Sequence, residues 1–499
     1  MLKLQNYING VLTPPASQHY FQSLNPATGK AHAEVPDSDA RDVDMACVAA
    51  EAAFLKWRDL GHEKRAAYLI RLAQLIETHA ARLAHAESVD NGKPLKLAQH
   101  VDIPRAAANF NFYGTGILHY ASESHAMEGM ALNYTLRQAV GVVGCISPWN
   151  LPLYLFSWKI APALAAGCTV VAKPSEITPY TAFLLSELCI EAGFPPGVLN
   201  IVHGYGQRCG DAIVRHPLIK AISFTGGTAT GKHIAAVAAP EFKKLSLELG
   251  GKNANIIFED CDFEAMLKTT LLSSFSNQGQ ICLCGSRILI QRSIYSTFER
   301  AFIDAVKRLK VGDPLNAETQ IGAIVSKSHF EKILSYIELA KTEGGTVLCG
   351  GSALKLDGAC AQGLFIAPTV ISGLSPGCRV NQEEIFGPVL SVMRVDDVAS
   401  AIQLINDHEF GNGTAIFTRD GNTAREFVSR IQVGMVGVNV PIPVPMAFHS
   451  FGGWKRSLFG DHHVHGPEGV RFYTRMKAVT QRWPETIVQG SSFTMPVNG

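Results

Sequence analysis

Two segments of this sequence carry residues that could perform covalent chemistry. The cysteine Cys282 ends the glycine- and amide-rich stretch Phe275-Ser-Asn-Gln-Gly-Gln-Ile-Cys282, and Glu248 lies upstream in Leu247-Glu-Leu-Gly-Gly-Lys-Asn253. A cysteine is a strong nucleophile as the thiolate, and a base is needed to clear the covalent adduct that it forms. The pair therefore predicts a reaction in which Cys282 binds the substrate covalently and Glu248 helps to release it.

Short apolar runs alternate with helical segments on both sides of Glu248. Before this glutamate the predicted strands lie at 141–146, 169–172, 198–202, 221–224 and 245–249, with helices at 181–192 and 210–216. After it, strands at 255–258, 287–291, 364–370 and 389–395 are separated by helices at 262–276, 295–309, 327–343 and 397–406. This alternation predicts an α/β fold with two successive, mostly parallel sheets that carry helices on both faces.

The ends of the chain and one internal segment depart from this alternation. Residues 1–40 are rich in turn-forming residues, whereas 42–86 and 97–120 show helical periodicity. Residues 127–138 alternate loosely and predict a strand or hairpin. Residues 472–487 favour a strand that could pair with another chain.

The composition limits the classes of function. The chain has 499 residues, of which 47% are hydrophobic and 17% charged, and its formal net charge is +1. We therefore expect no nucleic-acid or membrane partner, and we find neither a signal sequence nor an apolar run of membrane length. The 11 irregularly spaced cysteines favour a reduced, cytoplasmic protein. Cys284 forms a C-x-C pair with Cys282, but without a second Cys/His pair we predict no metal site.

Six short motifs resemble, in this order, those of the aldehyde dehydrogenase superfamily. They are Pro148-Trp-Asn150, Lys173-Pro-Ser-Glu176, Phe224-Thr-Gly-Gly-Thr228, Leu247-Glu-Leu-Gly-Gly251, Gly279-Gln-Ile-Cys282 and Glu384-Ile-Phe-Gly-Pro388. Any one of them could occur by chance, whereas the ordered set is specific. The resemblance covers residues 5–485 and implies a Rossmann-like NAD-binding domain (1–120 and 139–249), an α/β catalytic domain (250–450) and β strands for oligomerisation (121–138 and 467–490). It also implies a homodimer or homotetramer.

The resemblance assigns the chemical roles of three residues. Cys282 would attack the aldehyde carbon, and the Asn150 amide with the Cys282 backbone N–H would stabilise the resulting thiohemiacetal alkoxide. Loss of hydride to the nicotinamide would leave a thioester, which Glu248 would hydrolyse by activating water. The alternatives are a buried structural thiol at Cys282 and a salt-bridged carboxylate at Glu248.

The same resemblance implies a binding site for NAD. The carboxylate of Glu176 would bind the adenosine ribose hydroxyls and repel a 2′-phosphate, although Lys173 could offset that repulsion. Glycines 226 and 231 would let the pyrophosphate approach the backbone at a helix N-terminus. The expected cofactor residues are Ile146, Ser147, Pro148, Trp149, Lys173, Ser175, Glu176, Gly226, Gly227, Gly231, Leu249, Glu384 and Phe386.

Two resemblances bear on the substrate. The region around Glu248 and Cys282, with Asp102-Ile-Pro-Arg105, is similar to 2-aminomuconate- and 2-hydroxymuconate-semialdehyde dehydrogenases, whereas residues 438–457 resemble methylmalonate-semialdehyde dehydrogenase. Arg105 stands at the carboxylate-binding position of both families. Two further arginines of these families are absent, because 447–450 contain none and Ile281 replaces the one beside the cysteine. The hypothesis is an acidic semialdehyde held by Arg105.

Three alternatives stay open. A neutral or aromatic aldehyde could occupy an apolar tunnel lined by Tyr154, Trp158 and Phe448. The acyl group could pass to coenzyme A, but relatives that do so lack the glutamate found here at Glu248. A non-catalytic protein on the same scaffold is disfavoured by the intact Cys282 and Asn150.

Overall fold

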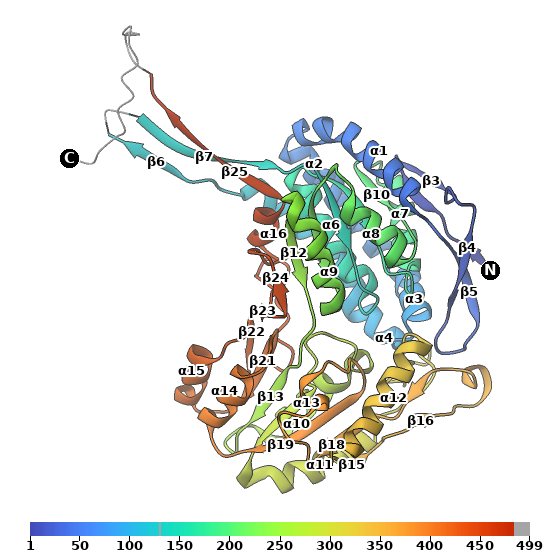
Figure 1. The fold of residues 1–499 in the computed structure, drawn as a ribbon, viewed down its shortest axis with the longest axis vertical. Coiled ribbons are helices and arrows are strands. Elements are labelled where there is room, and N and C mark those ends of the chain that lie inside the picture. The colour runs from blue at the N-terminus through green and yellow to red at the C-terminus, as the bar shows by residue number, and fades with distance from the viewer. Residues whose placement is uncertain (129–130, 484–499) are drawn as a thin grey trace.

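An eight-stranded sheet organises the first domain of the computed structural model, which describes residues 1–128 and 131–483 (Figure 1). Its strand order is β24-β12-β11-β8-β9-β10-β2-β3, and the strands from β12 to β10 run parallel. The strands are β2 (Asn6–Ile8), β3 (Val11–Thr13), β8 (Val142–Ile146), β9 (Thr169–Lys173), β10 (Leu199–Ile201), β11 (Ile219–Thr225), β12 (Lys244–Glu248) and β24 (Leu458–Phe459).

Helices bury both faces of this sheet, so β8 and β9 are buried along their whole length. The segment predicted as helical at 42–86 is broken at Gly61, whose φ of 87° requires the left-handed region. The helices of this domain are α1 (Ala40–Asp59), α2 (His62–Thr78), α3 (Ala80–Asn91), α4 (Leu95–Leu97), α5 (Ile103–Gly116), α6 (Pro152–Ala166), α7 (Tyr180–Glu191), α8 (Asp211–Arg215), α9 (Thr228–Ala238) and α16 (Pro467–Phe472).

A seven-stranded sheet of order β15-β18-β19-β14-β13-β21-β22 forms the second domain and is parallel except for β15. Its strands are β13 (Ala254–Ile257), β14 (Arg287–Gln291), β15 (Thr346–Cys349), β18 (Thr369–Ser372), β19 (Val389–Val395), β21 (Gly413–Phe417) and β22 (Met435–Val438). Its helices are α10 (Phe263–Phe275), α11 (Tyr295–Lys307), α12 (Lys327–Thr342), α13 (Arg379–Gln382), α14 (Val398–Asn406) and α15 (Gly421–Arg430).

The single strand predicted at 364–370 is wrong. Two strands occupy this region, β17 (Phe365–Ile366) and β18, and they belong to different sheets. Pro368 lies between them and has no N–H to continue a ladder. The remaining short strands are β1 (Leu2–Lys3), β4 (Tyr20–Leu24), β5 (Ala31–Pro36), β16 (Ala353–Leu354), β20 (Phe410–Gly411) and β23 (Trp454–Lys455).

A three-stranded antiparallel ribbon projects from the first domain (Figure 1). It contains β6 (Ser124–Met127), β7 (Ala131–Ala139) and β25 (Thr474–Gln481). The predicted C-terminal strand therefore pairs with β7 of its own chain, from Thr474 opposite Ala139 to Gln481 opposite Leu132. Residues 467–472, expected in the strand region, form α16 instead, and 484–490 lie outside the described residues.

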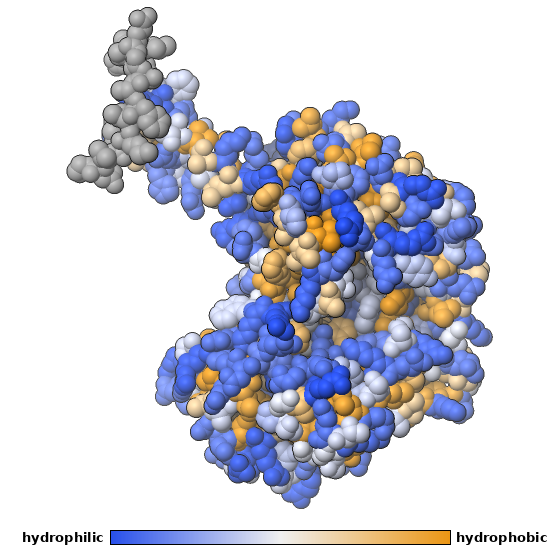
Figure 2. Space-filling model, viewed as in Figure 1, coloured by the Kyte–Doolittle hydropathy of each residue, from blue (hydrophilic) through white to orange (hydrophobic). Residues whose placement is uncertain are grey.

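The surface of the view in Figure 2 is mostly hydrophilic, with apolar residues scattered among the polar ones. A hollow lies between the two domains, below the ribbon. Among the described helices, none has the length and apolarity needed to cross a lipid bilayer.

A buried ion cluster ties α3 and α5 to the start of α6. The Lys93 ammonium lies 2.5 Å from the Asp102 carboxylate and 3.4 Å from that of Glu87, and the three side chains are fully buried. The second Glu87 oxygen accepts from the Leu153 backbone N–H at 3.4 Å. Burial raises the pKa of Asp102 and raises that of Glu87 to about 7, with Lys93 opposing both shifts. The lysine therefore keeps two buried carboxyl groups paired beside the helix that follows Asn150.

Replacing Lys93 by methionine should destabilise the protein by roughly 3–5 kcal/mol, because it leaves two buried carboxyl groups without a cation. Urea denaturation of Lys93→Met measures the loss. Lys96→Met, at an exposed position on the same segment, is the matched control and should stay within about 0.5 kcal/mol of the parent protein. Equal stability of both variants would contradict a role for the cluster.

Candidate active site

The loop that carries Cys282 connects α10 to β14 and has an unusual backbone. Asn277, Gln278 and Gly279 have φ values of 52°, 57° and 70°, so three successive residues are left-handed, at a cost of roughly 1–2 kcal/mol for each non-glycine. The Gln278 side chain donates to the Ala323 carbonyl at 3.0 Å. A Cβ on Gly279 would lie 2.2 Å from the Gly387 carbonyl oxygen, so only glycine allows this approach.

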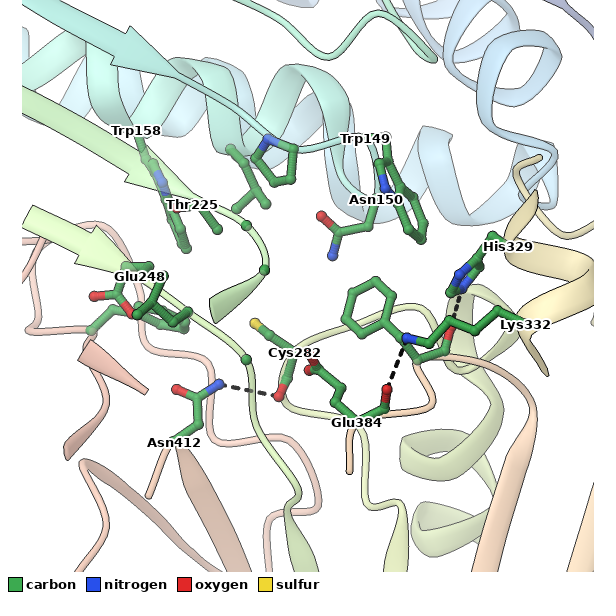
Figure 3. A pocket seen from close by; sticks show the side chains of 18 residues that line it. Trp149, Asn150, Trp158, Thr225, Glu248, Cys282, His329, Lys332, Glu384 and Asn412 are labelled. Carbon is green, nitrogen blue, oxygen red and sulfur yellow. Dashed lines mark hydrogen bonds between the residues drawn. The ribbon is translucent and has the colours of Figure 1, made fainter. Parts of the chain in front are cut away.

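Two side-chain amides fix the backbone of Cys282. The amides of Asn253 and Asn412 donate to its carbonyl at 2.5 and 3.1 Å. In Figure 3 the Cys282 sulfur points into a space between Asn150 and Glu248. Burial, followed by the charges of Glu248 and Glu384, raises the pKa of the thiol to about 12. The resting residue is therefore a thiol that needs a proton acceptor to become a nucleophile.

Asn150 lies in the turn between β8 and α6. Its carbonyl accepts from the Asn277 amide at 2.9 Å, and its own amide donates to the Gln280 carbonyl at 3.0 Å. A primary amide has two N–H groups, so one donor remains for a group bound at the cysteine. The position suits stabilisation of an oxyanion.

Glu248 is the last residue of β12 and is almost fully buried. One of its carboxyl oxygens has no hydrogen-bond partner among the described residues. Burial raises the pKa of Glu248 to about 8, while the nearby Lys159 ammonium opposes this shift. Burial likewise lowers the pKa of Lys159 to about 8, and its ammonium donates to the Thr225 hydroxyl at 2.7 Å. A carboxyl group that titrates near neutrality suits a general base.

One cavity of about 260 Å³ brings these groups together. Eleven of the predicted residues line it: Asn150, Glu248, Cys282, Pro148, Trp149, Trp158, Gly226, Gly227, Leu249, Glu384 and Phe386. The further lining residues are Leu155, Thr225, Gly250, His329, Lys332, Asn412 and Phe451. Several of these side chains are labelled in Figure 3.

The glycine turn after β11 is open at Gly227, whereas a Cβ on Gly226 would lie 2.4 Å from the Phe224 ring. A Cβ on Gly227 would meet nothing within 4 Å, and α9 begins at the next residue, so its N-terminal amides face open space. The space at Gly231, in contrast, is filled by Leu249, whose Cδ2 would lie 2.4 Å from an added Cβ. Gly231 therefore lets the helix approach the chain after β12, and this contact differs from the approach to pyrophosphate that we expected.

Glu384 and Phe386 form the opposite wall. The Gly251 N–H donates to the Glu384 carboxylate at 3.0 Å. Phe386 has a φ of 63°, and His329 Nε2 donates to its carbonyl at 2.7 Å. The Trp149 ring packs edge-on against Phe386 with 5.3 Å between centroids. This wall of rings beside Cys282 is suited to a planar nicotinamide.

Lys173 and Glu176 pair with each other at 3.1 Å after β9. Burial raises the pKa of Glu176, but the Lys173 charge and hydrogen bonds, including one from the Gly206 N–H, lower it overall. The carboxylate is therefore charged at neutral pH and available to sugar hydroxyl groups. Ile146, Ser147 and Ser175 are buried near these strand ends.

The predicted substrate residues lie in different surroundings. Arg105 is partly buried, donates to the Pro445 carbonyl at 3.1 Å and lies 6.0 Å over the Tyr154 ring. Tyr154 is buried behind Trp158, at 5.4 Å between centroids. Phe448 is 62% exposed and packs against Phe112, so it does not line the cavity.

Sequence reasoning missed Lys159, Thr225, His329, Lys332, Asn412 and Phe451 at this site. Lys159 did carry a signal, since it is the one charged residue in the apolar helix α6. The others come from segments far apart in the sequence. In the described residues, no group of three or more metal-ligating side chains is arranged to hold a metal ion.

Comparison with known proteins agrees with this geometry. The model of the aldehyde dehydrogenase family matches residues 13–479. The chain belongs to this family. It is 46% identical to 2-aminomuconic semialdehyde dehydrogenase of Danio rerio over 96% of this chain and 98% of that relative. It is 39% identical to 2-hydroxymuconic semialdehyde dehydrogenase of Pseudomonas sp. (strain CF600), over 96% and 99%.

Solved structures of this family show the same fold. The NAD+ complex of aldehyde dehydrogenase from Bacillus cereus has a TM-score of 0.93 at 36% identity and covers 96% of both chains. An aldehyde dehydrogenase from Burkholderia cenocepacia has a TM-score of 0.93 at 37% identity, over 97% of this chain and 100% of that one. The predicted α/β class and family are confirmed. The similarity to the muconic semialdehyde dehydrogenases also covers 96% of the chain. It is therefore not confined to the region around Glu248 and Cys282.

If Glu248 acts as a base, kcat should rise with pH and reach half its maximum near pH 8, because the carboxylate forms above its pKa of about 8. Lys159→Met removes the cation that opposes this raised pKa, so the rising limb should move to higher pH. Profiles of kcat from pH 6 to pH 10 measure the shift. Lys268→Met, an exposed residue on α10, is the control, and an unmoved limb in Lys159→Met would refute the coupling.

Proposed function

We propose that this aldehyde dehydrogenase oxidises an acidic semialdehyde to the free carboxylic acid, with NAD as the hydride acceptor. The observation that carries the proposal is the cavity in which Cys282, Asn150 and Glu248 face the wall of Glu384 and Phe386. A nucleophile, an oxyanion donor and a base lie together beside a site for a planar cofactor. These are the groups that aldehyde oxidation through a thioester requires.

In the first half-reaction the Cys282 thiol gives its proton to the Glu248 carboxylate, which releases it to solvent, and the sulfur attacks the aldehyde carbon. The new C–S bond gives a thiohemiacetal, whose oxygen accepts from the free N–H of Asn150 and from the Cys282 backbone N–H. NAD+, when bound, would supply the acceptor for the hydride that leaves this carbon, and loss of the hydride would leave a thioester on Cys282. Glu384 would hold the nicotinamide ribose, and Phe386 with Trp149 would orient the ring.

In the second half-reaction Glu248 takes a proton from water, and the hydroxide attacks the thioester carbon. The C–S bond breaks, the acid leaves and the sulfur regains a proton. The raised pKa of Glu248 supports this role because a weaker acid is a better proton acceptor. The same glutamate argues against transfer of the acyl group to coenzyme A, which needs no activated water.

Two features support NAD as the cofactor. Structurally similar members of the family are known as NAD+ complexes, including the Bacillus cereus enzyme. In this chain the Glu176 carboxylate lies at the end of β9, where a 2′-phosphate would be repelled. Its pairing with Lys173 weakens the repulsion, so the discrimination against NADP is expected to be partial.

The acidic substrate rests on Arg105. Among the described residues, the one hydrogen bond found for this guanidinium is from its Nη1 to the Pro445 carbonyl, at 3.1 Å. A substrate carboxylate would make a stronger, charge-assisted bond than this carbonyl does. The similar muconic semialdehyde dehydrogenases are named for semialdehydes of this kind. A neutral or aromatic aldehyde remains the second candidate, since Trp158, Leu155 and Phe451 give the cavity an apolar wall.

The domain roles and the assembly follow the same reasoning. Residues 1–120 and 139–249 would bind NAD, 250–450 would carry the cysteine, and the ribbon of β6, β7 and β25 would pair with another copy. Both edges of the ribbon are open in the described chain, and such edges favour pairing with a further strand. We therefore propose a homodimer or homotetramer.

Arg105→Ala should raise the KM for an acidic aldehyde by roughly tenfold to a hundredfold, because it removes a charge-assisted hydrogen bond. The KM for a neutral aldehyde of equal length should change by less than about twofold. NADH absorbance with 6-oxohexanoate and hexanal measures both constants, and the free acid should be the product even when coenzyme A is present.

Equal effects of Arg105→Ala on the two aldehydes would refute the acidic substrate. An acyl-coenzyme A product would refute hydrolysis. Neither result would bear on the NAD-dependent oxidation at Cys282, which NADH formation tests separately.

A further inference from the structure

Two hydroxyl groups of β11 hold the buried ammonium of Lys159. It donates to the Thr225 hydroxyl at 2.7 Å and to the Ser223 hydroxyl at 3.3 Å. Ser223 and Thr225 are two residues apart on one strand, so their side chains face the same side of the sheet. The strand register places Thr225 opposite Glu248 of β12, so the proposed base lies on this side as well. One hydroxyl is therefore next to the base, and the other is farther from it along the strand.

Beyond Ser223, the hydrogen bonds continue away from the catalytic cavity. The strand register places Ser223 opposite Cys145 of β8. The Tyr473 hydroxyl lies 3.6 Å from the Cys145 sulfur, and Ser223 is the other hydrogen-bonding neighbour of that hydroxyl. Each of these side chains is almost fully buried, as is Lys159. Lys159, Ser223, Tyr473 and Cys145 therefore form one buried hydrogen-bonded chain.

The backbone of Tyr473 is held at the foot of the ribbon, where α16 ends and β25 begins. Its carbonyl accepts from the Val140 N–H at 3.1 Å and from the Cys168 thiol at 3.2 Å. The Lys244 ammonium donates to the carbonyl of the next residue, Thr474, at 3.0 Å. These bonds fix the point from which the phenol hydroxyl reaches into the core of the first domain.

Around Lys159 and Glu248, ionisable side chains come from several elements: Cys145 of β8, Cys282 of the loop after α10, His465 before α16, and Tyr473. Burial raises the pKa of each of the two cysteine thiols to about 12 and holds the pKa of Tyr473 well above its usual range. Burial lowers the pKa of His465 to about 3. These four groups are therefore neutral at physiological pH, and a hydrogen bond to Lys159 acts on the charge balance between Lys159 and Glu248.

We propose that Ser223 and Tyr473 are positioning residues for the oxidation: Ser223 holds the Lys159 ammonium beside Glu248, and Tyr473 orients the Ser223 hydroxyl. The inference rests on the proposed role of Glu248 as the base. An ammonium has only donors, so the Ser223 oxygen accepts from Lys159 and its hydrogen is left for Tyr473. Loss of either hydroxyl favours the neutral amine of Lys159 and so removes part of the charge that stabilises the Glu248 carboxylate. The chain thereby connects the foot of the ribbon with the base.

Profiles of kcat against pH test both residues, because Ser223→Ala and Tyr473→Phe each remove a single hydroxyl. The rising limb should move to higher pH by roughly 0.5 unit in Ser223→Ala and roughly 0.3 unit in Tyr473→Phe, less than in Lys159→Met. For Ser223→Ala this shift corresponds to a kcat about threefold lower at pH 7. The KM values for NAD and for the aldehyde should stay within about twofold of the parent values. Ser223→Thr keeps the hydroxyl and should restore the parental profile.

Two further variants keep the test decisive. Tyr7→Phe, at another buried tyrosine of the first domain, is the matched control and should leave the profile unchanged. The double variant of Ser223→Ala and Tyr473→Phe should shift the limb no further than Ser223→Ala alone, because Tyr473 acts through Ser223.

A loss of kcat by the same factor at every pH, with the limb in place, would show a merely structural role and overturn the inference. If the limb moves in Lys159→Met but not in Ser223→Ala or Tyr473→Phe, only this inference fails. If the limb stays in place in Lys159→Met as well, and Glu248→Gln turns over like the parent enzyme, the proposed base itself fails.

Discussion

The contact between Gly279 and Gly387 governs the arrangement of the whole site. A side chain at Gly279 would lie 2.2 Å from the Gly387 carbonyl oxygen, so the cysteine loop can approach the 384–388 segment only through a glycine. The three left-handed residues before Gln280 create this approach and are unfavourable by themselves. This contact holds the loop of the nucleophile against the wall formed by Glu384 and Phe386. The distance between Cys282 and this wall is therefore set by backbone packing. A cofactor can bind between them without a rearrangement of the loop.

Burial of ionisable groups is the second common theme. Cys282, Glu248 and Lys159 are all buried at this site, and burial is the largest cause of each pKa shift. A thiol and a carboxyl group with raised pKa values keep their protons at rest and give them up only when a charge develops nearby. Farther from the cavity, the buried ion pairs of Lys93 stabilise the start of α6 through the hydrogen bond between Glu87 and Leu153. The same helix carries Trp158 and Lys159.

Much of the fold and of the site could be predicted from the sequence, because each motif keeps residues of related function at a fixed spacing along the chain. The parallel sheets followed from apolar runs, and the ordered motifs indicated the family. The failures have physical causes. The strand at 364–370 was wrong because apolar content outweighed Pro368. His329 and Asn412 could not be found because tertiary contacts, rather than sequence neighbours, bring them to the site. The catalytic roles of Cys282, Glu248 and Asn150 stay predictions until they are tested.

The most direct test of the account is a pre-steady-state burst experiment with Glu248→Gln, a substitution that keeps the cavity shape but removes the base. Mixed with NAD+ and excess 6-oxohexanoate, the variant should release one equivalent of NADH per site in a burst. Steady turnover should then be slower than that of the parent enzyme by roughly a hundredfold or more. Mass spectrometry should find the acyl group on the Cys282 peptide. Unchanged steady turnover, or an adduct on another residue, would contradict oxidation at Cys282 followed by hydrolysis at Glu248.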